Sequence, residues 1–564
     1  MDTICTSQNL EKIGKKEMVR LNGNLAYSSV FYNASGIENR RQPFTWFLNG
    51  SIAANLLDVS LPFTFTYSNN QVAYTQPFNM QSFTPTYKWI KGYAGITAMN
   101  FSQYTLAGHV FAGAGIELNP KKIRFSCMYG RLKKAVSFVS EPSNEENLSY
   151  KRMGFGATLG YEDNGHALKV IYFSAKDLPT SLSFVPINST VMPMENTVVS
   201  VVGRTTVYKK VTISAEYALS GLTRNINLTE DLSTTPKNRL PFIFTPKSTT
   251  QFYDAFKSSI GYSHKLVGLS LNYERVSPNY QTLGAYFFNN DLENITIAPT
   301  VSFLEGKLSL SLNTGVQRNN LDRSKLNTTK RWVSSANINY MPTKKLTVFG
   351  TVSNFSTYTR QKPMEDPYYT NTLDTLNFYQ LSQNAMVNVN YSFGTTKVKQ
   401  VSSLSVSYQV SSQEQGEAKG NNWLSHNTKS AIPTRFVNTN LSHTSTLIKT
   451  RTSITAGLNA NYGLSSIGTN LYVGPTVNLA QSFYKNTMRI SLGATYNQLL
   501  NDTRKINEIF NERISFMFTP KFKKQNSGNV SFSLTAMYLQ KLKTTSTALS
   551  YNEFTGNMGV NYSF

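Results

Sequence analysis

The residues of this chain best suited to metal binding or acid–base catalysis are its five histidines. A zinc or metalloprotease site needs imidazoles at short, regular spacing, as in the H-x-x-x-H pattern on a helix. No two histidines of this sequence stand at such a spacing, so we predict no metal site and expect structural or solvent-facing roles. The histidines are His109, His166, His264, His426 and His443.

One histidine has carboxylates nearby in the sequence. His426 follows Glu414 and Glu417 in a single polar stretch. A hydrolase would also need an activated nucleophile, such as one at a strained turn, and none is recognisable here. The Gly154-Phe155-Gly156 run does not open a helix after a strand, so it is no dinucleotide fingerprint. We therefore predict no catalytic residues, no cofactor and no enzymatic activity.

The two cysteines, Cys5 and Cys127, are too far apart to form a ligand motif, and they predict neither a disulfide framework nor a thiolate site. Lipidation of Cys5 would need an apolar segment upstream, and only Met1-Asp2-Thr3-Ile4 precedes it. Residues 1–20 are polar and basic, without the apolar region of a signal peptide. We expect either that a leader has been removed or that the start codon is misplaced.

The chain is strongly basic, with a formal net charge of +24. A basic chain first suggests nucleic-acid binding. The lysines do not form one patch, however; they recur in short connectors between apolar-alternating segments, which a barrel would place on one rim. We expect that rim to meet anionic lipid headgroups and not nucleic acid. The residues are Lys121, Lys122, Lys209, Lys210, Lys344, Lys345, Lys523 and Lys524.

The elements that would position these residues are strands. In residues 530–538, Val530, Phe532 and Leu534 alternate with Ser531 and Ser533. Such period-two alternation places one face of a strand in an apolar environment. The same pattern returns many times along the chain, and a tyrosine often closes the apolar row, as expected for the aromatic girdle of a membrane barrel.

The connectors between these strands also alternate, short and then long. Tight periplasmic turns and longer extracellular loops produce this pattern in transmembrane barrels. We predict an all-β, antiparallel, up-and-down transmembrane barrel of about 24 strands, with 22 to 26 as the range. Residues 86–118 fit one kinked strand or two strands equally well. Residues 1–18 are assigned to a periplasmic segment and residues 19–564 to the barrel.

The C-terminus resembles the insertion signal of bacterial outer-membrane barrels. Asn557, Gly559, Tyr562 and Phe564 stand at the polar, glycine and aromatic positions of that pattern. The resemblance implies that the outer-membrane insertion machinery is a partner and that the protein resides in the outer membrane, although no leader is present.

Three internal stretches resemble large outer-membrane barrel proteins of Bacteroidota. They are residues 101–109, 113–120 and 272–294. The resemblance implies location and fold, and no activity. In barrel size the chain also resembles TonB-dependent receptors, but no plug domain of roughly 130 residues precedes the first strand, which is expected near Val19. This departure puts energised uptake by the chain alone in doubt.

Four charges fall on the polar face of predicted strands. They are Arg124, Glu216, Glu274 and Arg489. They could line a lumen and tune solute selectivity. They could instead pair with each other across neighbouring strands, which we favour because lumen charge alone does not identify a substrate.

Barrel width shapes the functional prediction. A barrel of about 24 strands has a backbone diameter of roughly 45–50 Å, and wide barrels are normally plugged. We expect the long connectors 225–253, 358–378 and 411–434 to fold inward, or a protein subunit to occlude the pore. The predicted function is a transport or translocation channel, alone or in an uptake or secretion assembly. The alternative is a closed scaffold or accessory subunit of a larger complex.

Overall fold

The structure is a computed structural model of the whole chain, and it describes most residues from position 19 onward. The predicted N-terminal segment 1–18 and the His426 region therefore lie outside the described residues. The described ranges are 19–69, 80–138, 148–187, 189–228, 235–286, 288–324, 330–354, 356–357, 380–413, 434–465, 468–502, 504–520, 528–542 and 550–564.

The described residues form one β-sheet, and their sequence alternation accounts for its strands. The first half of the chain contains β1 (Val19–Ser35), β2 (Phe44–Leu56), β3 (Val59–Ser68), β4 (Met80–Phe83), β5 (Thr86–Tyr87), β6 (Ile90–Asn100), β7 (Ala107–Leu118), β8 (Ile123–Lys133), β9 (Lys151–Asp163), β10 (His166–Leu178), β11 (Glu195–Val207), β12 (Val211–Thr223), β13 (Thr250–Ser263) and β14 (Val267–Val276).

The second half continues the same sheet. It contains β15 (Leu292–Phe303), β16 (Leu308–Arg318), β17 (Lys330–Thr343), β18 (Leu346–Ser353), β19 (Ser356–Thr357), β20 (Gln380–Gly394), β21 (Val398–Gln413), β22 (Thr434–Leu447), β23 (Thr452–Ser465), β24 (Gly468–Phe483), β25 (Met488–Asn501), β26 (Arg504–Phe518), β27 (Asn529–Leu542) and β28 (Tyr551–Ser563).

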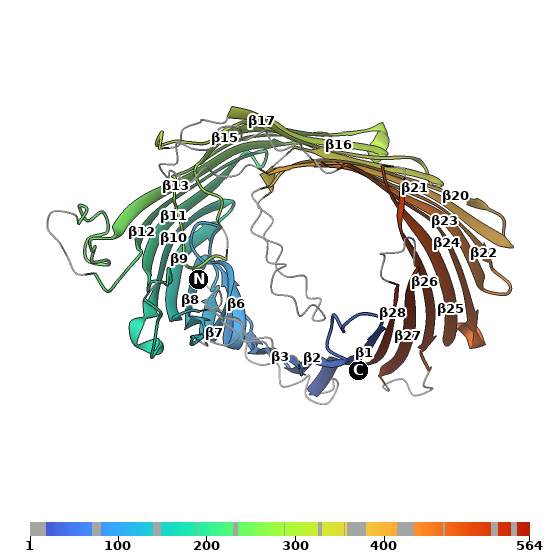
Figure 1. Cartoon of the computed structure of the whole chain (residues 1–564). Coiled ribbons are helices and arrows are strands. Elements are labelled where there is room, and N and C mark those ends of the chain that lie inside the picture. Colours follow the sequence, from blue (N-terminus) through green and yellow to red (C-terminus); the bar gives the residue numbers. More distant parts are fainter. Residues whose placement is uncertain are drawn as a thin grey trace, which may run out of the picture.

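The sheet closes on itself as an antiparallel barrel. Neighbours in the sequence are neighbours in the sheet, and β28 pairs with β1 to complete the ring, from Asn24 opposite Ser563 to Ser35 opposite Asn552. Figure 1 shows the two ends of the chain's colour range, blue and dark red, side by side at this closure. Closure leaves no free sheet edge, which is the condition for a sheet to cross a bilayer.

The barrel has 26 strands, rather than the 24 that the sequence predicts. Segments β4 and β5 are halves of one interrupted strand, because both pair with β3 on one side and β6 on the other. Segments β18 and β19 likewise share β20 as a neighbour. Counting each interrupted strand once reduces 28 segments to 26.

The difference in strand number has a local cause. Residues 86–118 contain two full strands, β6 and β7, so the two-strand interpretation of this stretch is correct. Other strands follow each other with hardly any connecting residues: β23 ends at Ser465 and β24 begins at Gly468. Such a junction lacks the proline- and asparagine-rich composition that marks the other long-loop connections.

The short turns lie at one end of the barrel. The turns after β7, β11 and β17 all join consecutive antiparallel strands at the end where β1 begins and β28 finishes. The longer connections lie at the opposite end, together with a few tight ones. This polarity matches the predicted short-turn and long-loop pattern. Three short 3-10 helices occur within the described ranges: Pro179–Ser181, Leu304–Gly306 and Tyr484–Asn486. None of the helices in these ranges is long and apolar enough to cross a bilayer.

The wall separates two environments, as β10 illustrates. Leu168 and Val170 point outward, with exposed fractions of 57% and 46%. The intervening side chains point inward, and Ile171 and Phe173 there are completely buried. Nothing covers the outward row among the described residues, which suits contact with hydrocarbon. Something inside the barrel must cover the inward row.

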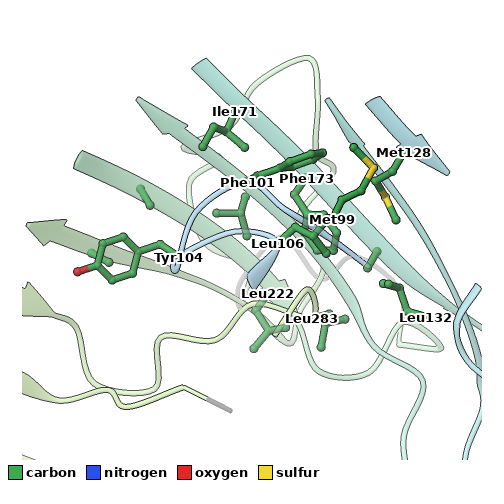
Figure 2. Close-up of a cluster of buried hydrophobic side chains, with 14 of the residues drawn as sticks. Met99, Phe101, Tyr104, Leu106, Met128, Leu132, Ile171, Phe173, Leu222 and Leu283 are labelled. Atoms are coloured by element: carbon green, nitrogen blue, oxygen red, sulfur yellow. The ribbon is translucent and has the colours of Figure 1, made fainter. Parts of the chain in front are cut away.

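Two connections cover that inner wall. Residues 101–106 join β6 to β7, and residues 277–291 join β14 to β15. Their apolar side chains form one buried cluster with the inward residues of the wall. Figure 2 shows Phe101 and Leu106 from the first connection and Leu283 from the second gathered against the strands. Burial of each such side chain contributes about 1.5–3 kcal/mol, so the cluster fixes both connections to the wall.

The prediction that 225–253 folds inward is wrong for its described part. Phe244 lies over the outward side of Gly221 on β12, and Arg239 pairs with Asp254, an outward residue of β13. Figure 1 shows the connection between β12 and β13 outside the ring. The inner side of the same strands is already covered by 277–291. The connector 358–378, also expected to fold inward, lies outside the described residues. Of the third one, 411–434, residues 411–413 and 434 belong to β21 and β22, and the remainder lies outside the described residues.

Candidate functional site

The candidate site is the part of the lumen beside these two connections. We call residues 101–106, 277–286 and 288–291 the lumen insert. The two segments of the insert bind each other directly. The Tyr280 hydroxyl donates a hydrogen bond of 2.8 Å to the carbonyl of Tyr104, and the Thr282 hydroxyl donates one of 2.7 Å to the carbonyl of Thr105. All four residues are almost completely buried, so the insert is a single packed unit.

Gly284 shows how tightly the two segments approach each other. A Cβ at this position would lie 2.6 Å from the carbonyl oxygen of Thr105 and 2.8 Å from the ring of Phe173. The carbonyl of Gly284 also accepts a hydrogen bond of 2.9 Å from the backbone of Ala107. A residue without a side chain is therefore required where the insert meets both its partner segment and the wall.

Charged wall residues hold the first segment of the insert. Glu274 on β14 accepts hydrogen bonds of 2.7 Å from the Tyr104 hydroxyl and 2.9 Å from the Gln103 amide. Lys257 on β13 donates to Gln103 at 3.1 Å. Lys169 on β10 donates to the carbonyl of Phe101 at 2.7 Å. Hydrogen bonds to charged groups are the stronger class, worth about 1.5–3 kcal/mol each.

Neutral polar groups hold the second segment. The buried Asn196 side chain on β11 accepts a hydrogen bond of 3.0 Å from the backbone of Leu283. The Ser220 hydroxyl on β12 donates to the carbonyl of Gln281 at 2.8 Å. Asn196 and Ser220 also bond each other at 2.8 Å. The insert therefore rests on contacts from five strands, β10 to β14.

The protonation of the insert tyrosines follows from their surroundings. Burial raises the pKa of Tyr104 far above its usual value, and the negative charge of Glu274 adds to the rise. Burial likewise raises the pKa of Tyr280. Both phenols therefore stay protonated throughout the accessible pH range and act as hydrogen-bond donors.

The predicted polar-face charges all lie on the inward side of the wall. Glu216 and Glu274 face Lys257 from either side, in register across β12, β13 and β14. Glu216 also accepts a hydrogen bond of 2.9 Å from Ser200. Both carboxylates thus have partners on neighbouring strands, and Glu274 also binds the insert.

The other two polar-face charges lie at the short-turn end. Arg124 pairs with Glu162 on β9 at 3.1 Å, a residue outside the predicted four. Arg489 stands opposite Ser482, in the second pair of β25 counted from the turn. Neither residue approaches the lumen insert, so the four charges do not form one site.

The basic turn residues that the structure describes lie at the short-turn end of the barrel. Lys121 and Lys122 follow β7, and Lys122 pairs with Asp163 of the next turn at 2.7 Å. Lys209 and Lys210 lie between β11 and β12, and Lys344 and Lys345 lie between β17 and β18. The remaining pair, Lys523 and Lys524, lies outside the described residues.

The C-terminal residues take part in barrel closure. Phe564 exchanges backbone hydrogen bonds of 2.8 and 3.0 Å with Gly23. A Cβ on Gly23 would lie 2.5 Å from the Phe564 ring, which stacks on Tyr562. Asn557 and Gly559 stand opposite Val30 and Ser28 of β1. In the folded barrel the last strand is therefore paired on both sides.

The described histidines do not form a site. His109 stacks on Tyr286 of the insert with 4.1 Å between ring centroids. His166 contacts Thr205 and His443 contacts Ser402, each on a neighbouring strand. Among the described residues, no group of three His, Cys, Asp or Glu side chains could hold a metal ion.

Sequence reasoning missed the lumen insert as a structural unit. It did single out 101–109 and 272–294, by resemblance, without a reason to place them together. The signal that was available is composition. Tyr280, Leu283 and Tyr286 lie in a connector between two strands, where solvent exposure would be expected. Three large apolar side chains at such a place predict that the connector packs against another surface.

No protein-family model matches the chain, and no curated protein matches it. Solved structures give weak matches to outer-membrane proteins. OccAB4 of Acinetobacter baumannii matches with a TM-score of 0.30 and 10% identity over 73% of this chain and 97% of that chain. The P pilus usher PapC, as its translocation pore, matches with a TM-score of 0.40 and 9% identity over 96% of this chain and 99% of that chain. Scores this low add no argument to the barrel seen directly in the strand pairing.

Proposed function

We propose that this chain is an integral outer-membrane β-barrel that acts as a transport or translocation channel, alone or as the channel of an uptake or secretion assembly. The observation that carries the proposal is that the described residues fill only part of the lumen. A barrel of 26 strands has a backbone diameter of about 50 Å. The lumen insert, the largest packed unit that the described residues form inside the ring, rests on one stretch of wall, from β10 to β14.

The wall opposite the insert supports the same proposal. Its inward positions carry neutral polar side chains, such as Asn390 of β20, Asn440 of β22 and Asn478 of β24, each of them exposed. The outward positions of the same strands carry apolar side chains, among them Leu441 and Val477. An apolar exterior with a polar interior is the arrangement of a water-filled membrane barrel.

The way the insert is attached favours a gated channel over a permanent seal. Its polar contacts with the wall run through single side chains, Glu274, Lys257, Lys169, Asn196 and Ser220. The insert is connected to the barrel at both ends of each segment, so its detachment would break these contacts and the packing of the buried cluster but no strand pairing. Detachment would widen the lumen.

We further propose outer-membrane lipid, the barrel-insertion machinery and an occluding or accessory protein subunit as partners, and no enzymatic activity. The basic rim suits anionic lipid headgroups. The paired C-terminal strand with Tyr562 and Phe564 suits recognition during assembly, before β28 meets β1.

Single-channel recording in planar bilayers tests the proposal. We expect the purified protein to conduct, and a variant with residues 279–289 replaced by a short Gly-Ser linker to conduct more. A matched variant with residues 236–248 replaced in the same way removes a connection outside the ring and should keep the original conductance. No conductance in any of the three proteins, with normal heat-modifiable migration on gels, would favour the closed scaffold.

A further inference from the structure

The connection between β12 and β13 ends in an apolar tip that nothing in the described chain covers. Phe242 is fully exposed and Ile243 is about half exposed. Phe242 also has a φ of +71°, a conformation that costs a bulky residue energy. Yet the tip is held in shape, because Asn238 donates to the carbonyl of Phe244 and accepts from the backbone of Leu240, both at 2.8 Å.

The tip has a fixed place on the outside of the barrel. Arg239 makes two hydrogen bonds, of 2.8 and 2.9 Å, to the carboxylate of Asp254. Tyr217 donates a hydrogen bond to the same carboxylate. Residues 217 and 254 belong to the outward rows of β12 and β13, opposite in direction to the inward Glu216 and Ala255. Phe244 packs on Phe252 of the same outward face, with 6.0 Å between ring centroids.

The height of this attachment along the barrel matters. A strand tilted by about 40° gains roughly 2.5 Å of height per residue, so an apolar band of about 25 Å takes about ten residues. Counting from the turn before Val211, the band ends near Ser220. Tyr217 is the last exposed outward residue of β12; beyond it Leu219 is half-buried, and Phe244 of the connection covers Gly221. The connection therefore leaves the wall of the barrel at the height of the outer edge of the apolar band.

Charge on the connection agrees with this position. Residues 224–249 carry four basic side chains, Arg224, Lys237, Arg239 and Lys247, against two acidic ones, Glu230 and Asp231. Basic side chains beside exposed apolar ones are the composition of segments that lie in a lipid interface.

We propose that Phe242 and Ile243 insert into the outer leaflet of the surrounding bilayer, with the Arg239–Asp254 pair as the clamp that aims them. The tip then adds to the apolar outward row of β12 that includes Ile213 and Tyr217. This anchor fixes the barrel's depth in the membrane, a role separate from conduction through the lumen.

Spin labelling with power-saturation EPR in nanodiscs tests this placement. A nitroxide is placed by Phe242→Cys in a Cys5→Ser, Cys127→Ser background. Leu271→Cys, on the bare outward face of β14, provides the hydrocarbon reference. Glu305→Cys, in the turn after β15, provides the aqueous reference. We expect the label at 242 to be accessible to oxygen and protected from the nickel reagent, close to the label at 271.

Two further measurements sharpen the result. Adding Arg239→Ala should release the tip, raising its nickel accessibility towards that of the label at 305 while leaving the label at 271 unchanged. Measurements in phospholipid nanodiscs with and without lipopolysaccharide show which of these two lipids the tip contacts. A label at 242 as nickel-accessible as that at 305 in both discs would overturn the proposal. The same label is also measured in native membranes, where protection that is absent from both discs would indicate a protein partner and would likewise overturn the proposal. Aqueous behaviour of the label at 271 would instead overturn the membrane placement itself.

Discussion

The hydroxyl of Tyr104 is the best single point at which to test how the lumen insert is held. Tyr104 is completely buried, and its hydroxyl donates a hydrogen bond of 2.7 Å to Glu274 on the wall. Tyr104→Phe keeps the ring and its edge contact with Tyr280, 6.1 Å between centroids, and removes only that donor. The carboxylate keeps one further bond, from Gln103.

The size of the effect follows from the kind of bond that is lost. A hydrogen bond to a charged group contributes about 1.5–3 kcal/mol. Because every 1.4 kcal/mol changes an equilibrium about tenfold, the ratio of detached to attached insert should rise roughly 10- to 150-fold. Since Gln103 still binds the carboxylate, we expect the lower part of that range.

Single-channel recording measures this ratio as the time spent at the higher conductance level divided by the time spent at the lower level. The matched control is Tyr217→Phe, which removes a hydroxyl donor from the carboxylate of Asp254 on the outside of the same barrel. We expect a change of at least about tenfold for Tyr104→Phe and none for Tyr217→Phe. Equal dwell-time ratios in wild type and Tyr104→Phe would refute the reasoning that the insert gates the lumen through this contact.

Three further predictions follow from the same contacts. Burial raises the pKa of Tyr104, so its protonated form persists above the usual tyrosine value near 10; the difference in dwell-time ratio between wild type and Tyr104→Phe should therefore persist from neutral pH up to that value, and its loss within this range would contradict the assignment. Phe564→Ala removes the ring that packs on Gly23 at barrel closure, so we expect less heat-modifiable, folded protein, whereas Phe532→Ala on the neighbouring strand should assemble normally. Gly284→Val would place a branched side chain against the Thr105 carbonyl and the Phe173 ring, and should increase conductance as the insert deletion does, without lowering the folded fraction on gels.

The sequence by itself determined which segments form the strands of the barrel wall and which of their side chains point to the same face. Alternation such as that of Val530, Phe532 and Leu534 defines both faces of a strand, because side chains along a strand point alternately to opposite sides. The short basic turns and the first strand near Val19 follow from local composition in the same way. The strand number was less certain, because a junction such as that between Ser465 and Gly468 carries no loop signal.

Only the tertiary structure decided what fills the lumen. Residues 101–106 and 277–291 are separated in sequence by eight strands, β7 to β14, yet they form one unit because both connections fold inward and meet against the inner face of the curved wall. The connector at 225–253, expected inside, lies outside because the inner side of β12 is already occupied. Alternation decides which way a strand residue points, whereas the side of the wall that a loop takes depends on which surface its neighbours leave free.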